Sequence, residues 1–318
     1  MKRVVVALVG CTASGKTAVG ELVACGLDGE VVCADSRQVF RELDIGTGKP
    51  PAAERAARPH HLFDSLSVTA YGPAAGDAPR ATAGWYARAA RVACAAVHAR
   101  GRVPVLVGGS GLYLRAAREG LTPTPEVDPA IREQLQGELA ARGAAALHRR
   151  LAERDPAAAR AIHAADGQRI TRALEVIEST GHGLAWWREQ PATAAVEGEW
   201  RAFLLAVPPD ELRRRIERRT HWMFENGLID ETQALIRRGL RPAMATLHAI
   251  GYDETLALMA GELERPAAEQ RTRLRTAQLA KRQRTWFRHQ MRAERIDASG
   301  DSDERLAAQV IAQVRRAG

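Results

Sequence analysis

The stretch VVVALVGCTASGKT, residues 4–17, decides the fold. Its first six residues form a continuous apolar run, largely β-branched, which is typical of a central strand buried on both faces. The next eight match the pattern GxxxxGK[ST], and residues 16–26 then read as a helix closed by Gly26. A strand, a glycine-rich turn and a helix in this order predict a phosphate-binding P-loop rather than a chance match.

Each residue type in this loop has a use in binding phosphate. Glycines let the backbone turn so that N–H groups and the helix N-terminus face phosphate oxygens. Lys16 adds a positive charge, and the hydroxyl of Thr17 can bind Mg²⁺, which is the one cofactor we expect. A glycine-rich turn without a ligand is the alternative, and the flanking strand and helix disfavour it. The loop leaves open which phosphates it holds.

Further apolar runs at residues 31–34 and 103–107, with a helical pattern over 85–100 between them, predict βαβ units. The expected fold class is therefore α/β, a P-loop NTPase-like parallel sheet flanked by helices. Residues 71–84 read as a loop. A strand-like run returns at 203–207, and a short strand is possible near 295–297.

Between these strands the sequence changes character. After Gly120, Asp128-Pro129 and Asp155-Pro156 each supply a helix N-cap followed by proline, and no strand pattern occurs up to about residue 199. We therefore predict a discontinuous catalytic core, residues 1–120 plus 200–318, with an all-helical insertion domain at 121–199.

Composition limits the class of protein. The 318 residues carry a net charge of +8, and nine basic residues against one acid fall between Arg271 and Arg295. A second basic stretch, residues 212–219, holds five arginines, so the pattern favours a nucleic-acid partner. Four cysteines without a CxxC pair indicate a reducing cytoplasm, and no apolar run is long enough for a membrane span.

Two polar residues follow predicted strands. Asp35 comes directly after residues 31–34, at the sheet edge where ligands bind, and it suits three roles: a magnesium ligand, a proton acceptor or a helix N-cap. Ser110, in the turn after residues 103–107, would present a hydroxyl at the same edge, although such turns often contain serine for conformational reasons alone.

Other features favour ordinary structural roles. His60 and His61 would point to opposite faces of a strand, which argues against a shared metal site. Trp186-Trp187 and Trp286-Phe287 read as packing residues, and residues 44–50 read as a loop.

Several motifs in one order closely resemble the bacterial tRNA dimethylallyltransferase family, over nearly the whole chain. They are GCTASGKT at 10–17, ADSRQVFRELDIGTGKP at 34–50, PHHLFD at 59–64, VLVGGSGLYL at 105–114, QRITRALEV at 168–176, IGYDE at 250–254 and LAKRQRTWFR at 279–288.

The resemblance implies transfer of a dimethylallyl group from dimethylallyl diphosphate to N6 of adenosine 37, in tRNAs that read codons beginning with U. The adenine leaves the anticodon-loop stack to reach the donor. Asp35 becomes the general base, Ser110 a hydroxyl beside it, and Arg219, assisted by Arg215, a clamp on the diphosphate. The partners are tRNA and dimethylallyl diphosphate, with no membrane, and the protein is expected to be a monomer.

The resemblance also assigns contacts. The donor would lie against Gly10, Thr12, Ala13, Ser14, Gly15, Lys16, Thr17 and Arg215. The tRNA would lie against Asp35, Ser36, Arg37, Gln38, Ser110, Arg132, Gln168, Arg169, Ile170, Thr171, Arg172, His248, Gly251, Tyr252, Lys281, Arg282, Gln283, Arg284, Trp286 and Arg288.

The chain departs from the family at four of these motifs' positions. Cys11 stands where the family usually has proline, Ser110 where it has threonine, Gly48 where it has alanine, and Asp253 where it has lysine or arginine. Two other classes remain: an ATP-dependent small-molecule kinase, which would show no dependence on RNA, and an RNA-binding protein without catalysis, which a turnover assay would separate.

Overall fold

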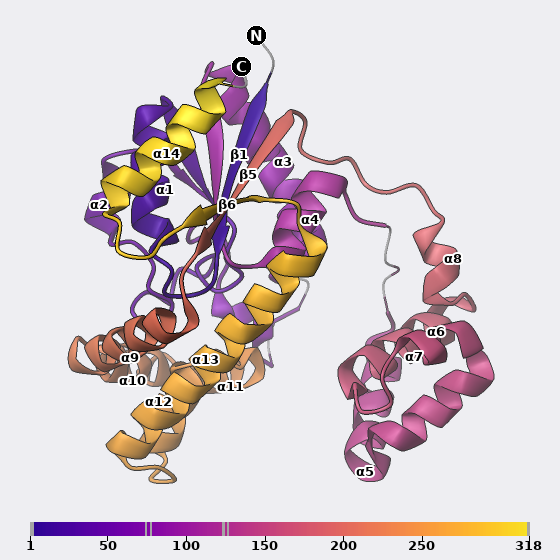
Figure 1. The fold of residues 1–318 in the computed structure, drawn as a ribbon. Coiled ribbons are helices and arrows are strands. Elements are labelled where there is room, and N and C mark those ends of the chain that lie inside the picture. Colours follow the sequence, from indigo (N-terminus) through magenta and orange to yellow (C-terminus); the bar gives the residue numbers. More distant parts are fainter. Residues whose placement is uncertain (1–2, 74, 77, 123–124, 126, 317–318) are drawn as a thin grey trace. The chain divides into compact units, whose positions relative to one another are not determined.

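The computed structural model describes residues 3–316 except 74, 77, 123–124 and 126. The chain forms two compact units (Figure 1). The core unit comprises Met1–Arg118 and Ala195–Gly318, and the helical unit comprises Glu119–Ala194.

A parallel sheet of six strands is the centre of the core unit, in the order β3-β2-β4-β1-β5-β6. The strands are β1 (Val4–Gly10), β2 (Gly29–Cys33), β3 (His60–His61), β4 (Val103–Gly108), β5 (Glu199–Ala206) and β6 (Glu294–Asp297). The predicted fold class is confirmed. β1 pairs with β4 on one side and β5 on the other, so its apolar run is buried on both faces.

Helices cover both faces of the sheet. On one face α1 (Lys16–Gly26) and α14 (Asp303–Arg316) pack against side chains such as Leu8 and Val107. On the other, α3 (Ala83–Ala99) and α4 (Gly111–Glu119) pack against side chains such as Val9 and Leu106. The core unit also contains α2 (Ala52–Ala56) and the short 3₁₀ helix η1 (Val68–Tyr71).

After β5 the chain forms a group of helices before it returns to β6. They are α9 (Pro209–Glu225), α10 (Leu228–Arg237), α11 (Arg241–Leu247), α12 (Tyr252–Met259) and α13 (Arg265–Gln290). α13 packs on both α9 and α12, and buried residues of these three helices belong to the same hydrophobic cluster as one face of the sheet. This group brings two arginine-rich helices, α9 and α13, to the carboxyl side of the sheet (Figure 1).

The helical unit has its own core. It contains α5 (Pro129–Arg154), interrupted at Gly143, then α6 (Pro156–Ala161), α7 (Gly167–Thr180) and α8 (Leu184–Arg188). The carboxylates of Asp128 and Asp155 accept hydrogen bonds from the first helical N–H groups, as their sequence predicts. Leucines and Ile170 from α5 and α7 fill the interior. Within the described residues of this unit the structure contains helices and no strand.

None of the helices that the structure describes has the length and apolar character needed to cross a membrane.

Candidate active site

The P-loop connects β1 to α1 by a turn that needs glycine. Gly15 has a φ of +89° immediately before the helix, and Ala13 also has a positive φ of 62°. A Cβ on Gly10 would lie 2.7 Å from the Ser14 hydroxyl. Among the residues that the structure describes, no side chain caps the start of α1, and its first turn holds no acid. The exposed N–H groups and the helix dipole therefore make this turn suitable for an anion.

Two basic side chains converge on this turn. Lys16 curls back so that its Nζ donates to the Cys11 carbonyl at 3.2 Å. Arg219, from α9, donates to Thr12 Oγ1 at 3.0 Å and to the Thr47 carbonyl at 2.9 Å. Burial lowers the pKa of both groups, and the charge of Asp35 only partly opposes this. Both cations thus bond to neutral oxygens and keep their charge available for a ligand.

At the neighbouring strand ends, Asp35 and Ser110 are held by backbone contacts. The Ser110 hydroxyl accepts a hydrogen bond from the Ser36 N–H at 2.9 Å, and the Ser110 N–H donates to the Ala34 carbonyl at 3.1 Å. Asp35 Oδ1 accepts from the Arg37 N–H at 2.9 Å. The Asp35 side chain thus forms an Asx turn with the backbone N–H two residues later. Among the described residues, its second oxygen, Oδ2, has no hydrogen-bond partner.

Arg219, Asp35 and Ser110 line one cavity of about 420 Å³. Its lining includes Thr12, Asp35, Ser110, Arg219, His248 and Gln283. Thr12 of the P-loop contributes to one part of the wall and the two strand ends to another, while α9, α13 and the loops at residues 46–47 and 248–250 supply the rest. The volume lies in the range of small-molecule sites. Ser36 and Arg37 also line it, so the predicted catalytic residues and part of the predicted RNA surface meet here.

Arg215 has a different environment from Arg219, although both lie on α9. Its guanidinium pairs with Glu211 at 2.5 Å and donates to the carbonyls of Ser14 and Ala298 at 3.2 and 3.1 Å. It does not belong to the cavity lining. Arg215 therefore contacts the P-loop backbone at Ser14, and its direct contact with the donor stays a prediction.

Several residues assigned to RNA contact instead serve the interior of the core unit. Tyr252 is 1% exposed, and its hydroxyl donates to Glu231 at 2.6 Å. Gly251 is buried at the start of α12, where its N–H donates to Glu254. Gln38 donates to the carbonyls of Thr47 and Gly48 at 3.2 and 3.0 Å. A direct RNA contact by the Tyr252 side chain is excluded in this structure because the side chain is covered.

Gln283 and Trp286, also assigned to RNA, have internal partners too. Gln283 bridges the P-loop and the turn after β4, as described below, and Trp286 packs so closely on Gly111 that a Cβ there would lie 2.3 Å from the ring. The reading of Trp286-Phe287 as packing residues is confirmed for Phe287, which is 2% exposed.

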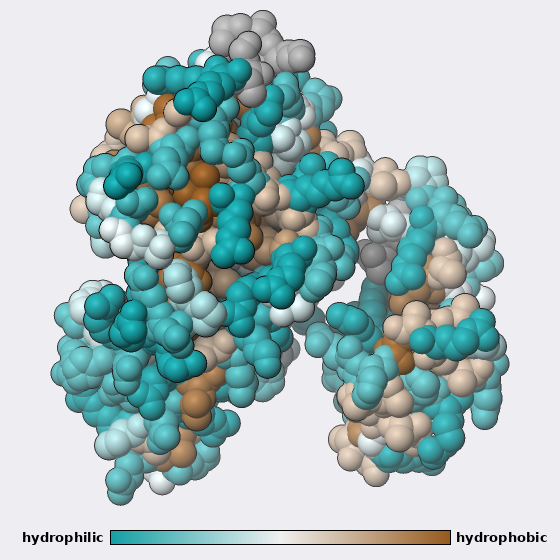
Figure 2. All heavy atoms as spheres, in the orientation of Figure 1, coloured by the Kyte–Doolittle hydropathy of each residue, from teal (hydrophilic) through white to brown (hydrophobic). Residues whose placement is uncertain are grey.

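The basic residues of α13 fall into two groups. Towards its N-terminus the arginines are ion-paired: Arg265 with Glu225, Arg271 with Glu254, Arg273 with Glu217, and Arg275 with Asp253 and Glu254. Towards its C-terminus no ion pair is found within the described residues for Lys281, Arg282, Arg284 and Arg288. We call these four residues the α13 basic patch. The viewed surface of this half of the helix is hydrophilic (Figure 2).

Asp253 stands where the family usually has lysine or arginine, and its ion pair with Arg275 explains the acidic residue. Its Oδ2 lies 2.8 Å from Arg275, a residue of the cavity lining. His248 has a left-handed backbone with a φ of 52°, is exposed, and lies 3.9 Å from Asp253. An acid at this position cannot attract a phosphate, and it reduces the charge of Arg275 instead.

In the helical unit the assigned residues divide by exposure. Gln168 and Arg169 are exposed at the start of α7. Arg132 and Arg172 both pair with Glu175, at 3.4 and 3.1 Å. Ile170 is 0% exposed and Thr171 is 5% exposed, so both side chains are buried within the helical unit, and their contact with RNA stays a prediction. Both belong to the inward side of α7, which the motif QRITR does not reveal until the helix is placed.

Outside the cavity, the structure differs from the prediction for Trp186 and gives His60 and His61 separate partners. Trp186, read as a packing residue, is 40% exposed and stacks on His182 with ring centroids 4.0 Å apart. His60 and His61 each contact a carboxylate, that of Glu21 and that of Glu30 respectively.

Sequence reasoning missed Lys49, Glu231 and the bridging role of Gln283. The only local signal was two charged residues, Asp44 and Lys49, within a segment read as a loop. Lys49 is almost completely buried, which is unusual for a lysine and therefore informative once the structure is known.

Comparisons with known proteins show the family of the chain. A family model described as IPP transferase matches residues 38–290. A tRNA dimethylallyltransferase of Stenotrophomonas maltophilia (strain K279a) is 44% identical, covering 98% of this chain and 97% of the relative. One from Salinispora arenicola is 43% identical over 98% of this chain and 87% of its own length.

Solved structures show the same likeness. The tRNA isopentenylpyrophosphate transferase of Bacillus halodurans is 32% identical, with a TM-score of 0.69 over 99% of this chain and 96% of that one. A eukaryotic dimethylallyltransferase acting on tRNA has a TM-score of 0.79 over 99% of this chain and 80% of that one, and at 24% identity it supports the fold alone. The family match and the near full-length identity together show that this chain belongs to the IPP transferase family.

Proposed function

We propose that this protein transfers a dimethylallyl group from dimethylallyl diphosphate to N6 of adenosine 37 in tRNA. The observation that carries the proposal is the single cavity in which Arg219 and Thr12 lie with Asp35 and Ser110. A cationic end suits a diphosphate, and a carboxylate suits removal of a proton from a nucleophile. A donor and an acceptor bound there would meet in one cavity.

At the cationic end, the P-loop N–H groups, Lys16 and Arg219 would hold the diphosphate. Arg219 already has one side fixed by Thr12 and Thr47, so it would bind without much loss of side-chain freedom. Thr17 lies in the first turn of α1, and its hydroxyl is a hard oxygen donor of the kind that Mg²⁺ accepts beside phosphate oxygens. When bound there, Mg²⁺ would supply further positive charge to the leaving diphosphate.

At the other end, N6 of the adenine attacks C1 of the dimethylallyl group. The new N–C bond forms as the C1–O bond breaks, and the electron pair of that bond leaves on the diphosphate. Asp35 accepts the proton that N6 loses, through the oxygen that the Arg37 N–H does not use. The Ser110 oxygen accepts from Ser36, so its own proton remains to be donated towards the reacting groups.

We further propose that the α13 basic patch contacts the tRNA backbone. Its four side chains have no carboxylate partner among the described residues, whereas the arginines nearer the N-terminus of α13 do. Phosphate oxygens are the natural partners for such charges, and they fix position rather than sequence. In the helical unit, exposed Gln168 and Arg169, with Arg132 and Arg172 beside Glu175, would contact the anticodon stem-loop.

The transfer would take place in the cytoplasm, for which the four free thiols are suitable, and with the protein as a monomer.

The test is transfer of label from dimethylallyl diphosphate to unmodified tRNA whose anticodon loop contains adenosines 36 to 38, with and without Mg²⁺. ATP with small acceptors serves as the competing reaction. We expect label on N6 of adenosine 37, dependent on Mg²⁺ and on the cationic end of the cavity. ATP turnover on a small acceptor without labelling of tRNA would replace the proposal by a kinase function.

A further inference from the structure

Residues 44–50, which we call the Thr47 loop, contact the guanidinium group of Arg219 through their backbone. The Thr47 carbonyl accepts a hydrogen bond of 2.9 Å from Arg219 Nη2, and Gln38 donates to the same carbonyl at 3.2 Å. Gly48 has a φ of +60°, and a Cβ there would lie 2.3 Å from Arg219 Nη2. The guanidinium therefore rests directly against the backbone of this loop, and its direction depends on where the loop lies.

One end of the loop is held by a half-buried carboxylate. Glu231, on α10, accepts hydrogen bonds from the N–H groups of Asp44 and Ile45, at 2.7 and 2.8 Å. The Tyr252 hydroxyl donates to the same side chain at 2.6 Å. Burial raises the pKa of Glu231, and these three donors only partly offset the effect. An acceptor with two oxygens is thus used to fix two successive amides of one turn.

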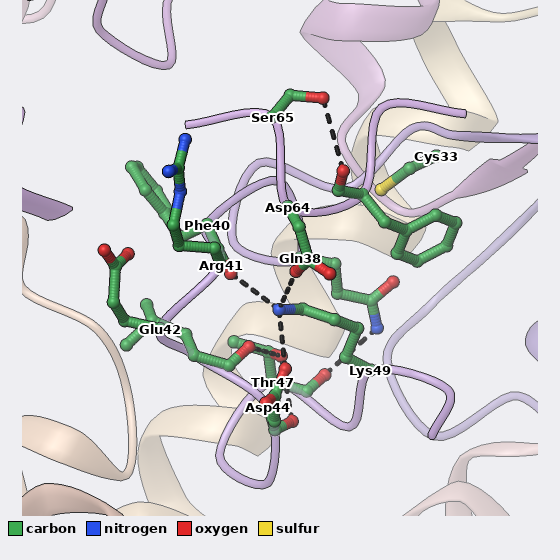
Figure 3. Close-up of polar contacts among 12 residues, drawn as sticks. Cys33, Gln38, Phe40, Arg41, Glu42, Asp44, Thr47, Lys49, Asp64 and Ser65 are labelled. Carbon is green, nitrogen blue, oxygen red and sulfur yellow. Dashed lines mark hydrogen bonds and ion pairs between the residues drawn. The ribbon is translucent and has the colours of Figure 1, made fainter. Parts of the chain in front are cut away.

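The other end is held by a buried ammonium group (Figure 3). The Lys49 side chain is 0% exposed, and its Nζ lies 2.6 Å from each of three oxygens: the Phe40 carbonyl, Asp64 Oδ1 and Asp44 Oδ1. Three N–H donors meet three acceptors. Asp64 is fixed in turn by Arg55; burial alone would raise the pKa of Asp64, but the bonds from Lys49 and Arg55 outweigh it and lower that pKa.

A fully buried ammonium group and a half-buried carboxylate are a costly way to hold a short loop if stability were the only result. Removing an ion from water carries a desolvation penalty that an apolar side chain of similar size avoids. The charged groups instead fix the backbone conformation of the loop, because their hydrogen bonds and ion pairs form only when the backbone lies in one position. Between the two fixed ends lies the carbonyl that orients Arg219.

We propose that Lys49 and Glu231 are positioning residues that fix the Thr47 loop and, through its carbonyl, direct Arg219 towards the diphosphate. This rests on the proposed function of the cavity. Neither residue touches substrate; each acts through Arg219. Loss of either frees the loop, so Arg219 can turn away from the P-loop while the fold remains.

The experiment is a double-mutant cycle between Lys49→Met and Arg219→Ala, repeated with Glu231→Gln. Two quantities are measured in each protein: kcat for dimethylallyl transfer, and the dissociation constant of inorganic diphosphate. Misplacement of a binding group by about 1 Å costs on the order of 100-fold in rate, so we expect kcat to fall about 10- to 100-fold in Lys49→Met. Diphosphate affinity falls with it, and tRNA affinity does not change.

The decisive result is whether the two substitutions have additive effects on kcat and on the affinity for diphosphate. If Lys49 acts through Arg219, Lys49→Met has little further effect once Arg219 is alanine. The control is Glu30→Gln, which removes a fully buried, ion-paired carboxylate elsewhere in the core unit and is expected to lower stability without coupling to Arg219. Full additivity, or unchanged diphosphate affinity in the folded single variants, would overturn the proposal.

The experiment also distinguishes two other outcomes, a variant that does not fold and a wild-type protein that has no transfer activity. If Lys49→Met does not fold, Glu231→Gln, which keeps the side-chain shape, carries the same test. If the wild-type protein transfers no dimethylallyl group, the proposed function fails, while the diphosphate cycle still reports whether Lys49 and Glu231 position Arg219.

Discussion

The amide oxygen of Gln283, on α13, accepts a hydrogen bond of 2.8 Å from the backbone N–H of Thr12 in the P-loop. Its amide nitrogen donates to the Gly109 carbonyl at 3.0 Å. The Gln283 side chain therefore links the P-loop after β1 to the turn after β4 by hydrogen bonds. These two segments both line the cavity, and the link fixes the distance between them. The helix that carries the α13 basic patch is joined to the phosphate site by this residue.

Gln283→Leu is expected to reduce transfer about 10-fold or more, because two hydrogen bonds that align the P-loop are lost and two backbone groups are left unpaired. The affinity for tRNA should stay within about two-fold, since the side chain faces inward. Kinetics and filter binding measure the two effects. A large loss of tRNA affinity at unchanged kcat would return Gln283 to the RNA surface.

Asp35→Asn keeps the side-chain shape and removes the proton acceptor. We expect kcat to fall by about 10²- to 10⁴-fold, the usual contribution of a general base, with tRNA affinity and thermal stability near those of the wild type. Single-turnover labelling of tRNA measures the chemical step directly. Turnover at the wild-type rate would remove Asp35 as the base.

Arg219→Lys preserves charge but replaces a planar fork by a single ammonium. It cannot bond to Thr12 Oγ1 and the Thr47 carbonyl while also reaching a diphosphate, so we expect kcat to fall about 100-fold. Arg218→Lys, at the neighbouring exposed position of α9, is the matched control and should be near wild type. Equal behaviour of the two variants would argue against the clamp.

The two halves of α13 give a comparison at constant charge. Lys281→Ala with Arg282→Ala removes two charges of the α13 basic patch, whereas Arg271→Ala with Arg273→Ala removes two that are already ion-paired. We expect the first pair to weaken tRNA binding and to reduce the salt dependence by about one phosphate contact per residue. The second pair should leave the slope nearly unchanged, and identical slopes for both pairs would contradict the assignment.

The free energy of unfolding should depend on the ionisation of the Glu30 carboxyl at acid pH. Hydrogen bonds from Arg100 and then His61, against the opposing effect of burial, lower the pKa of this carboxyl from 4.5 to about 2. Because the folded pKa is the lower one, the stabilisation is present above about pH 4.5 and is lost as the pH falls towards 2. The difference in unfolding free energy between wild type and Glu30→Gln should shrink by about 2 kcal/mol between neutral pH and about pH 3, measured by urea titration. A difference that is constant with pH would contradict the shift.

Much of the fold followed from local sequence. The apolar run of β1, the glycines of the P-loop and the start of α1 were read at their observed bounds within one residue, because a buried strand and a helix cap depend on neighbours in the chain. The proline-capped helices of α5 and α6 were found for the same reason. β3, only two residues long, carried no such signal.

The sequence by itself determined that a P-loop follows a central strand and that Asp35 and Ser110 lie at the ends of two more strands. Only the tertiary structure decided what the charged residues do. Arg215 and Arg219 are one helical turn apart with the same side chain, yet one is neutralised by Glu211 and the other reaches Thr12, 207 residues away in the chain. Lys49, Glu231 and Gln283 likewise acquire their roles from distant partners. Backbone preference is set by adjacent residues, whereas the charge that a site retains is set by which side chains folding brings together.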